Sequence, residues 1–301
     1  ILIDEAQTPL IISNNIQTPI EKYIVAAEIT DYLELNNHYK IDEKNKTIYF
    51  TARGIENSAR IDLYSIGFDG KNQKRLTIGE YNNAQVYIAP DAKHFVSVYS
   101  NIQTPTTIAV ISTQKKAVDV LGTAASSNTD PTKLAKTELI RIKSADGLIE
   151  LPALVTWPNH MDPNKKYPLL VSIYGGPNAG TVMDSWSSNP TKEGWAEEGL
   201  IQVAFDHRAS GHFGKEGINY MHRSLGKWEL TDWITIVKWL RNNGADATRI
   251  GAVGYCMSGP FVMWAAADFP DRFQSIASIH GANMVTDGAD SPHRMPPKIR
   301  C

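Results

Sequence analysis

The chain has 301 residues, enough for one large domain or two ordinary ones. Hydrophobic residues make up 42% of it and charged residues 21%, close to globular averages, which excludes wholesale disorder. Its 30 Lys and Arg against 32 Asp and Glu give a formal charge of -2, so no basic footprint points to nucleic acid or an anionic membrane. The two cysteines, Cys256 and Cys301, are too few for a disulfide framework or a four-cysteine zinc site.

The start of the chain shows no targeting signal. It does not begin with Met, and no charged segment precedes an apolar one. The longest uncharged stretch, Ile250 to Ala267, has about the minimum length of a membrane span, but Gly254, Gly259 and Pro260 interrupt it. We therefore expect a soluble protein, cytoplasmic by default, that contacts neither membranes nor nucleic acid.

The first 47 residues predict an apolar, strand-like opening followed by one helix. Thr18-Pro19-Ile20-Glu21 combines a capping hydroxyl, proline at the first helical position and a glutamate three residues after the cap. Apolar residues then repeat at helical spacing to about Leu35, and Asn36-Asn37 ends the run.

From Ile48 the apolar residues recur at every second position, which is typical of strands. Asp69-Gly70 is a hairpin signal, and Pro90-Asp91 marks another turn. The short runs supply fewer than two four-stranded propeller blades, so this region predicts a β-propeller fragment. The seven expected strands are Ile48–Thr51, Arg60–Phe68, Arg75–Ile78, Gln85–Ile88, His94–Tyr99, Thr107–Ile111 and Ala117–Leu121.

After a connector rich in Ser, Thr, Ala and Asn at Gly122–Lys136, strands and helices alternate. Alternation of this kind predicts a mostly parallel sheet with covering helices. The expected strands are Leu139–Lys143, Ala153–Trp157, Leu169–Tyr174, Leu200–Phe205, Ile250–Gly254 and Ser275–His280, and the expected helices are Leu225–Asn242 and Met257–Asp268.

The sharpest local signal is an apolar strand that runs into Gly254-Tyr255-Cys256-Met257-Ser258 and then a helix. Small residues at 254 and 258 allow a nucleophile to sit on a strained strand-to-helix turn. That turn would present the Cys256 thiol at a helix N-terminus, which favours thiolate, and the N–H of Met257 would donate to an oxyanion. A buried cysteine after a strand is the alternative interpretation.

A second oxyanion donor is expected in the loop after an earlier strand. The strand Leu169–Ile173 is followed by Tyr174-Gly175-Gly176-Pro177, which supplies a phenol and a glycine turn at that place. A tyrosine that closes a buried strand is the alternative.

A hydrolase triad also needs an acid and a histidine after the nucleophile. His280 ends the very next strand, which is too early for the usual base, and His293 is interpreted as a solvated loop residue. The same interpretation holds for the carboxylates that follow Cys256, namely Asp268, Asp271, Asp287 and Asp290.

The spacings of His207, His212 and His222 fit no compact set of metal ligands. No Gly-rich phosphate-binding loop occurs in the sequence. We therefore expect neither a metal site nor a cofactor.

Residues 1–13, ILIDEAQTPLIIS, together with the helix after them, resemble the SecA preprotein-translocase ATPase over about residues 1–47. In that family the stretch leads toward the preprotein-binding region, so a preprotein-binding fragment is one hypothesis. Neither nucleotide-binding motif of that family is present, so the resemblance does not imply ATP hydrolysis.

Residues 48–243 resemble the dipeptidyl-peptidase IV branch of the prolyl oligopeptidase family. This resemblance implies a peptidase that removes N-terminal dipeptides, and it assigns oxyanion stabilisation to Tyr174. A serine-type dipeptidyl peptidase acting through Ser210 or Ser258 is therefore an alternative. The resemblance rests on Tyr49–Gly54, Lys166–Leu170, Tyr174–Pro177, Asp206–Gly211 and Leu225–Glu229.

Residues 245–301 are similar to dienelactone hydrolase at Gly254–Gly259, Ser278–Ala282 and Val285–Asp287. That family uses a Cys–Asp–His triad, so Cys256 corresponds to its nucleophile, while its Asp and His would lie beyond residue 301. We expect a chimera whose triad is incomplete: an inactive or weakly active hydrolase for a small ester, a lactone or a peptide.

The predicted fold class is α/β, with an incomplete α/β-hydrolase sheet of about six strands. A β-propeller blade fragment and a short N-terminal helical segment precede the sheet. The open sheet edges would favour self-association. The expected domains are a SecA-like fragment at 1–47, a propeller-like fragment at 48–122 and a truncated hydrolase domain at 123–301, peptidase-like to about 243 and dienelactone-hydrolase-like after it, with joints at Lys46–Ile48 and Asn243–Asp246.

Overall fold

The computed structural model describes residues 35–54, 56–114, 117–125 and 134–299. The helix expected from Thr18 lies outside these residues. The chain divides into two compact units. The first unit contains the residues up to Ser127 together with Asp184–Trp186 and His212–Glu216, and the second contains the remainder.

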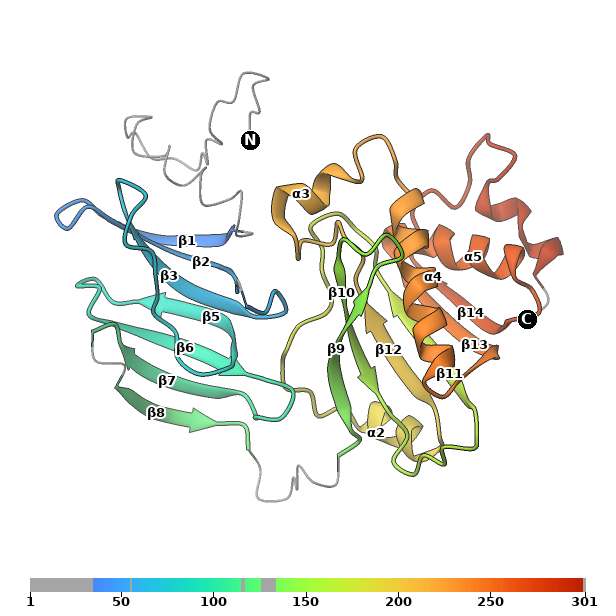
Figure 1. Ribbon diagram of the computed structural model, residues 1–301, viewed down its shortest axis with the longest axis horizontal. Coiled ribbons are helices and arrows are strands. Elements are labelled where there is room, and N and C mark those ends of the chain that lie inside the picture. The colour runs from blue at the N-terminus through green and yellow to red at the C-terminus, as the bar shows by residue number, and fades with distance from the viewer. Residues whose placement is uncertain (1–34, 55, 115–116, 126–133, 300–301) are drawn as a thin grey trace. The chain divides into compact units, whose positions relative to one another are not determined.

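The described part of the first unit contains two four-stranded antiparallel sheets (Figure 1). The first sheet consists of β1 (Leu35–Asp42), β2 (Thr47–Arg53), β3 (Ile61–Gly67) and β4 (Lys74–Arg75), in that order. The second sheet consists of β5 (Asn82–Ile88), β6 (His94–Ser100), β7 (Thr107–Ser112) and β8 (Val118–Thr123), also in chain order.

Strand β1 corrects the sequence-based prediction of fewer than two blades. The local pattern of its residues predicts only the end of a helix at Asn36-Asn37, but they pair with β2, and Ile41 lies opposite Ile48. Pairing with a neighbouring strand overrides the weak local signal of this Asn-containing segment. The seven expected strands are present with shifted ends, and β1 makes them eight strands in two four-stranded sheets.

The alternation of apolar residues along β3 fills two separate cores. Tyr64 stacks on Phe50 with ring centroids 5.6 Å apart, in a cluster confined to the first sheet. Leu63 points the other way and packs in a buried cluster with Phe95 and Ile111 of the second sheet. The two faces of one strand therefore hold the first sheet together and join it to the second.

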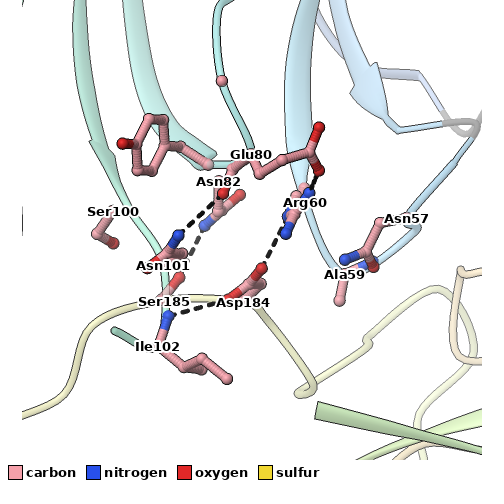
Figure 2. Close-up of polar contacts among 12 residues, drawn as sticks. Asn57, Ala59, Arg60, Glu80, Asn82, Ser100, Asn101, Ile102, Asp184 and Ser185 are labelled. Carbon is pink, nitrogen blue, oxygen red and sulfur yellow. Dashed lines mark hydrogen bonds and ion pairs between the residues drawn. The ribbon is translucent and has the colours of Figure 1, made fainter. Parts of the chain in front are cut away.

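The segment Asp184–Trp186, far along the sequence, completes the first unit (Figure 2). Asp184 is buried, and its carboxylate pairs with Arg60 Nε at 2.7 Å. The same carboxylate accepts the backbone N–H of Ile102 at 2.9 Å. Because Arg60 lies between β2 and β3 and Ile102 follows β6, this one carboxylate connects the two sheets.

The second unit is built on a six-stranded sheet with the order β14-β13-β11-β12-β10-β9 (Figure 1). Strands β11 to β14 pair in parallel, and β10 is antiparallel to both of its neighbours. A mostly parallel sheet of about six strands is therefore confirmed. The strands are β9 (Thr137–Lys143), β10 (Glu150–Thr156), β11 (Tyr167–Ile173), β12 (Ile201–Phe205), β13 (Ala245–Tyr255) and β14 (Phe273–Ile279).

The α-helices of the described chain are α2 (Pro190–Glu197), α3 (Gly214–Asn219), α4 (Lys227–Asn242) and α5 (Gly259–Asp268). Helices α4 and α5 were expected, and they pack on the sheet, α4 against β9, β10 and β13 and α5 against β13 and β14. Helix α4 begins after Gly226, whose N–H the Glu229 carboxylate accepts at 3.0 Å. None of the helices described is both long and apolar enough to cross a membrane.

Strands β14 and β8 lie at open sheet edges, as the sequence predicts. Strand β14 is the last member of the six-stranded sheet, and β8 is the last member of its four-stranded sheet. All six residues of β8 are exposed, including Leu121. Self-association through these edges remains a prediction.

Candidate functional site

The tight turn expected after β13 is present. The strand ends at Tyr255 and leads into a 3₁₀ helix, Cys256–Ser258, which continues into α5. Cys256 has φ of 51°, in the left-handed region that residues with a side chain rarely adopt, and its thiol is half-buried. The N–H of Met257 lies in the first turn of this helical segment, where backbone donors have no partner within the helix. We call this strained strand–turn–helix segment, Gly254–Gly259, the elbow.

Close backbone contacts explain the small residues around the elbow. A Cβ atom on Gly254 would lie 2.4 Å from the carbonyl oxygen of Ser258. A Cβ atom on Gly259 would lie 2.4 Å from Ser278 Oγ and 2.6 Å from the Cα atom of Gly281. Contacts this short admit only glycine at positions 254 and 259.

Strand β11 lies directly beside β13, with Ile173 opposite Gly254 in parallel register. The Ser258 hydroxyl, 2.8 Å from the carbonyl oxygens of both Ile173 and Tyr255, is a donor that joins the two strand ends. Tyr174 follows Ile173 directly. The turn that carries this phenol therefore starts beside the elbow, at the carboxyl edge of the sheet.

The glycine turn after Tyr174 is held by aromatic rings. Gly175 has φ of 73°, and a Cβ atom there would lie 2.8 Å from the Trp233 ring of α4. A Cβ atom on Gly176 would lie 2.5 Å from the ring of Tyr174 itself. Trp233 in turn meets Phe261 of α5 edge to face, with centroids 5.3 Å apart. The conformation of the turn is thus fixed by its contacts with α4 and with the tyrosine ring.

The loop Asp206–Gly211, which follows β12, is buried at every residue. The Asp206 carboxylate accepts the backbone N–H groups of Thr181 at 3.0 Å and Val182 at 2.7 Å. His207 Nε2 lies 3.1 Å from the carbonyl oxygen of Gly175. The loop therefore fixes both ends of the segment that runs from the Tyr174 turn to Val182.

Arg208 is fully buried at the centre of this loop. Its guanidinium binds Asp232 through Nε at 2.9 Å and Nη2 at 2.7 Å, and it binds Asp146 through Nη1 at 2.8 Å. It also lies 4.2 Å from the ring centroid of Trp228 and 4.7 Å from that of Tyr220. The hydrogen bond from Arg208 lowers the pKa of Asp146 to about 2.

No catalytic or positioning role for His207 or Arg208 was predicted from the sequence. A usable signal was present: three consecutive polar residues, Asp206-His207-Arg208, directly follow an apolar strand. Charged residues at such a place must either be solvated or find buried partners. Only the structure shows that the partners come from Asp146 and Asp232, far away in the sequence.

The histidines that follow the elbow have other contacts. His280 comes directly after β14, is exposed, and its ring centroid lies 6.3 Å from that of Tyr255. The Nδ1 atom of His293 makes a 2.7 Å hydrogen bond with Ser291 Oγ. In the described chain, no hydrogen bond joins the Cys256 thiol to an imidazole or a carboxylate. The four carboxylates considered with these histidines are all exposed: Asp268, Asp271, Asp287 and Asp290.

Both serines of the alternative hypothesis are buried and hydrogen-bonded to backbone. Ser258 donates to the strand ends described above, and Ser210 Oγ accepts the N–H of His207 at 3.2 Å. Neither hydroxyl is presented to a substrate. The histidines considered as metal ligands also have separate surroundings: His212 Nδ1 bonds Ser58 Oγ at 2.9 Å, His207 meets Gly175, and His222 is exposed.

Comparison with known proteins supports the peptidase resemblance. Residues 186–291 match the prolyl oligopeptidase family, and residues 19–106 match the dipeptidyl peptidase IV N-terminal region. These stretches of the chain are dipeptidyl-peptidase-like. The venom dipeptidyl peptidase 4 of Vespula vulgaris is 26% identical over 242 residues, which cover 76% of this chain and 31% of that protein. The crystal structure of Porphyromonas gingivalis dipeptidyl peptidase 4 has the same fold, with a TM-score of 0.71 at 22% identity over 89% of this chain and 38% of that one.

A short stretch is similar to a different protein. The translocase subunit SecA of Phaeodactylum tricornutum is 74% identical over 68 residues, which cover 21% of this chain and 8% of that subunit. This supports the SecA resemblance as a fragment only. The chain spans less than a third of the length of either curated relative.

The chimera hypothesis gains no support from these matches. The two matched stretches include Lys46–Ile48 and Asn243–Asp246, where the sequence analysis placed its joints. In the structure, the first joint lies at the start of β2, which pairs with β1. The second joint runs from the end of α4 into the start of β13, which pairs with β11 and β14 in one continuous sheet. The prolyl oligopeptidase match continues to residue 291, through the stretch that resembles dienelactone hydrolase.

Proposed function

We propose that this dipeptidyl-peptidase-like chain carries an acyl-transfer site at the elbow after β13, with Cys256 as nucleophile. The N–H of Met257 and the phenol of Tyr174 would receive the oxyanion. The observation that supports this most strongly is the left-handed φ of Cys256 at the end of a strand that lies beside the Tyr174 strand. A strained residue at the carboxyl edge of a parallel sheet is a typical position for a nucleophile.

The chemistry is an acyl transfer in two steps. The sulfur of Cys256, as thiolate, forms a bond to the substrate carbonyl carbon, and the electrons of the C=O bond move to its oxygen. When the carbonyl re-forms, the bond to the leaving group breaks, and the leaving group takes up a proton from water. Water then attacks the thioester, which releases the acid and restores the thiol.

The second step should be slow. Efficient attack by water needs a general base within hydrogen-bonding reach of it. The two histidines that follow Cys256 in the sequence have other contacts, His280 with the ring of Tyr255 and His293 with Ser291. We therefore propose that acylation is faster than deacylation. The substrate class is a peptide or a related ester, because the matched family is one of peptidases.

The test is a burst experiment with p-nitrophenyl acetate on the full chain. The account predicts a release of about one nitrophenolate per chain, followed by a much slower steady rate. Cys256→Ala should abolish the burst, whereas Cys301→Ala, the change at the other cysteine of the sequence, should keep it. A burst that survives in Cys256→Ala overturns the proposal. Fast steady turnover that depends on Cys256 would refute only the slow second step.

A further inference from the structure

The buried ring of His207 makes two hydrogen bonds, one as an acceptor and one as a donor. His207 is fully buried, and its Nδ1 atom accepts the backbone N–H of Ala209 at 3.1 Å. A neutral imidazole that accepts at Nδ1 carries its proton on Nε2. That proton therefore points to the carbonyl oxygen of Gly175, 3.1 Å away. One nitrogen of the ring holds its own loop, and the other holds the turn after β11.

The carbonyl that His207 binds belongs to the residue next to Tyr174. The peptide group of Gly175 is confined on one side by Trp233, against which a Cβ atom would lie at 2.8 Å. The ring of His207 meets the same Trp233 edge to face, with centroids 5.9 Å apart. The Tyr174 ring rests on Gly176, one residue further on. A rotation of the Gly175 peptide would therefore displace Gly176 and, with it, the Tyr174 ring that contacts it.

We propose that His207 is a positioning residue that orients Tyr174 toward the elbow through its hydrogen bond to the Gly175 carbonyl. The proposal rests on the acyl-transfer function proposed above. It adds a residue that touches neither substrate nor nucleophile. Preorganised donors are effective only when their direction is fixed before the reaction, because a free phenol would have to be ordered in each turnover.

The rest of the loop supports this assignment, because it holds the imidazole in a single place. Arg208, the next residue, is fixed by the Asp232 carboxylate on two of its nitrogens. Asp206, the preceding residue, is fixed by two backbone N–H groups. An imidazole between two such anchors cannot follow a moving turn, so it restrains the turn instead. Burial lowers the pKa of His207, which favours the neutral ring that this pair of bonds requires.

Two matched variants separate the two bonds of the ring. In His207→Gln the side-chain amide nitrogen lies near the position of Nε2 and keeps a donor for Gly175. In His207→Asn the shorter side chain keeps an acceptor for Ala209 but does not reach Gly175. We expect Gln to acylate Cys256 at nearly the wild-type rate and Asn to be slower by about tenfold to a hundredfold, the effect of a small misplacement in a preorganised site.

A purely structural role is distinguished by combining each variant with Tyr174→Phe. If His207 acts through the phenol, the difference between Asn and Gln disappears when the phenol is absent. The measured quantity is the rate of acetyl-Cys256 formation from p-nitrophenyl acetate, followed by intact mass on the full chain. Equal rates for Asn and Gln, or a difference that persists in Tyr174→Phe, overturn the inference.

Failure of the positioning role can be distinguished from failure of the acyl-transfer site. Absence of acetyl-Cys256 in the wild type refutes the acyl-transfer site itself. Formation of acetyl-Cys256 with additive effects of His207 and Tyr174 refutes only the positioning role. If the Asn variant does not fold, His207→Ala, which also lacks a donor for Gly175, takes its place, and its slower acylation must likewise disappear when it is combined with Tyr174→Phe.

Discussion

Two turns at the carboxyl edge of the six-stranded sheet are built in opposite ways. The turn after β12, Asp206–Gly211, is buried at every residue, and each of its first three side chains has a buried hydrogen-bond partner. The turn after β14, residues 280–290, is largely exposed, and Val285 in it is 74% exposed. Buried polar groups have to be paired, and such pairs fix the chain in one conformation. The turn after β12, which contacts the Tyr174 turn, is thus preorganised. The turn after β14, which lies near Cys256, is solvated.

The largest difference in stability between the buried turn and the surface is expected for the buried guanidinium of Arg208. Arg208→Ala leaves Asp232, which has no exposed side-chain surface, as an unpaired buried charge. Removal of one partner of a buried ion pair costs about 3–5 kcal/mol. We expect a loss of this size in the free energy of unfolding, measured by denaturant titration.

The matched control is an arginine with a partner at the surface. Arg249 pairs with Asp246 at 2.8 Å, but its side chain is 49% exposed. Arg249→Ala should therefore cost less than about 1 kcal/mol. Losses of equal size for the two arginines would contradict the view that the buried turn differs in kind from the surface.

A smaller effect is expected from Asp206→Asn. The amide nitrogen can no longer accept from one of the two backbone groups, Thr181 and Val182, that the carboxylate binds. A buried donor without a partner costs about 1–3 kcal/mol. Asp287→Asn makes the same chemical change in the exposed turn and should stay within about 0.5 kcal/mol. Denaturant midpoints of the two variants test this, and a larger loss in Asp287→Asn would reverse the comparison.

The smallest effect expected is a dependence of stability on pH. Burial lowers the pKa of His207, although the nearby carboxylates of Glu229, Asp206 and Asp232 oppose the shift. The unfolded chain then binds a proton near pH 6.5 that the folded chain does not bind. Above about pH 6.5 the ring is neutral in both states, and the stability is full. As the pH falls below this value toward the lower pKa of His207 in the folded chain, the free energy of unfolding decreases by at most about 1.4 kcal/mol per pH unit.

His207→Gln isolates the contribution of the buried ring to this pH dependence, because glutamine does not titrate. The difference in unfolding free energy between wild type and His207→Gln should shift against the wild type as the pH falls from about 7.5 to about 5.5. His293→Gln, the same substitution at an exposed histidine, is the matched control. A slope that is the same in wild type and His207→Gln would show that the buried ring does not couple to stability.

Periodicity and turn residues were sufficient to predict most of the fold. The seven strands of the blade region and the six strands of the sheet follow from alternating apolar residues and from Gly, Asp and Pro at the turns. Strand β1 was missed because its order comes from pairing with β2 and not from its own composition. Helix α2 was missed because it is short and contains Gly194, although Asn189 caps it and Pro190 begins it.

The candidate site was predictable only where it is local in sequence. The elbow at Cys256 and the glycine turn after Tyr174 are each encoded within a few neighbouring residues. The support of that turn joins distant segments: His207 lies 32 residues from its partner Gly175, and Arg208 lies 24 and 62 residues from its partners Asp232 and Asp146. No spacing rule encodes such pairs, because they depend on which strands become neighbours in the sheet.

The most direct test of the account is to locate the acyl group. The full chain is treated with p-nitrophenyl acetate, digested at a pH that preserves thioesters, and mapped by tandem mass spectrometry. The account predicts an acetyl group on Cys256, and a lower yield of it in Tyr174→Phe at equal reaction times. Acetylation confined to Ser210, Ser258 or surface lysines, with Cys256 unmodified, would contradict it.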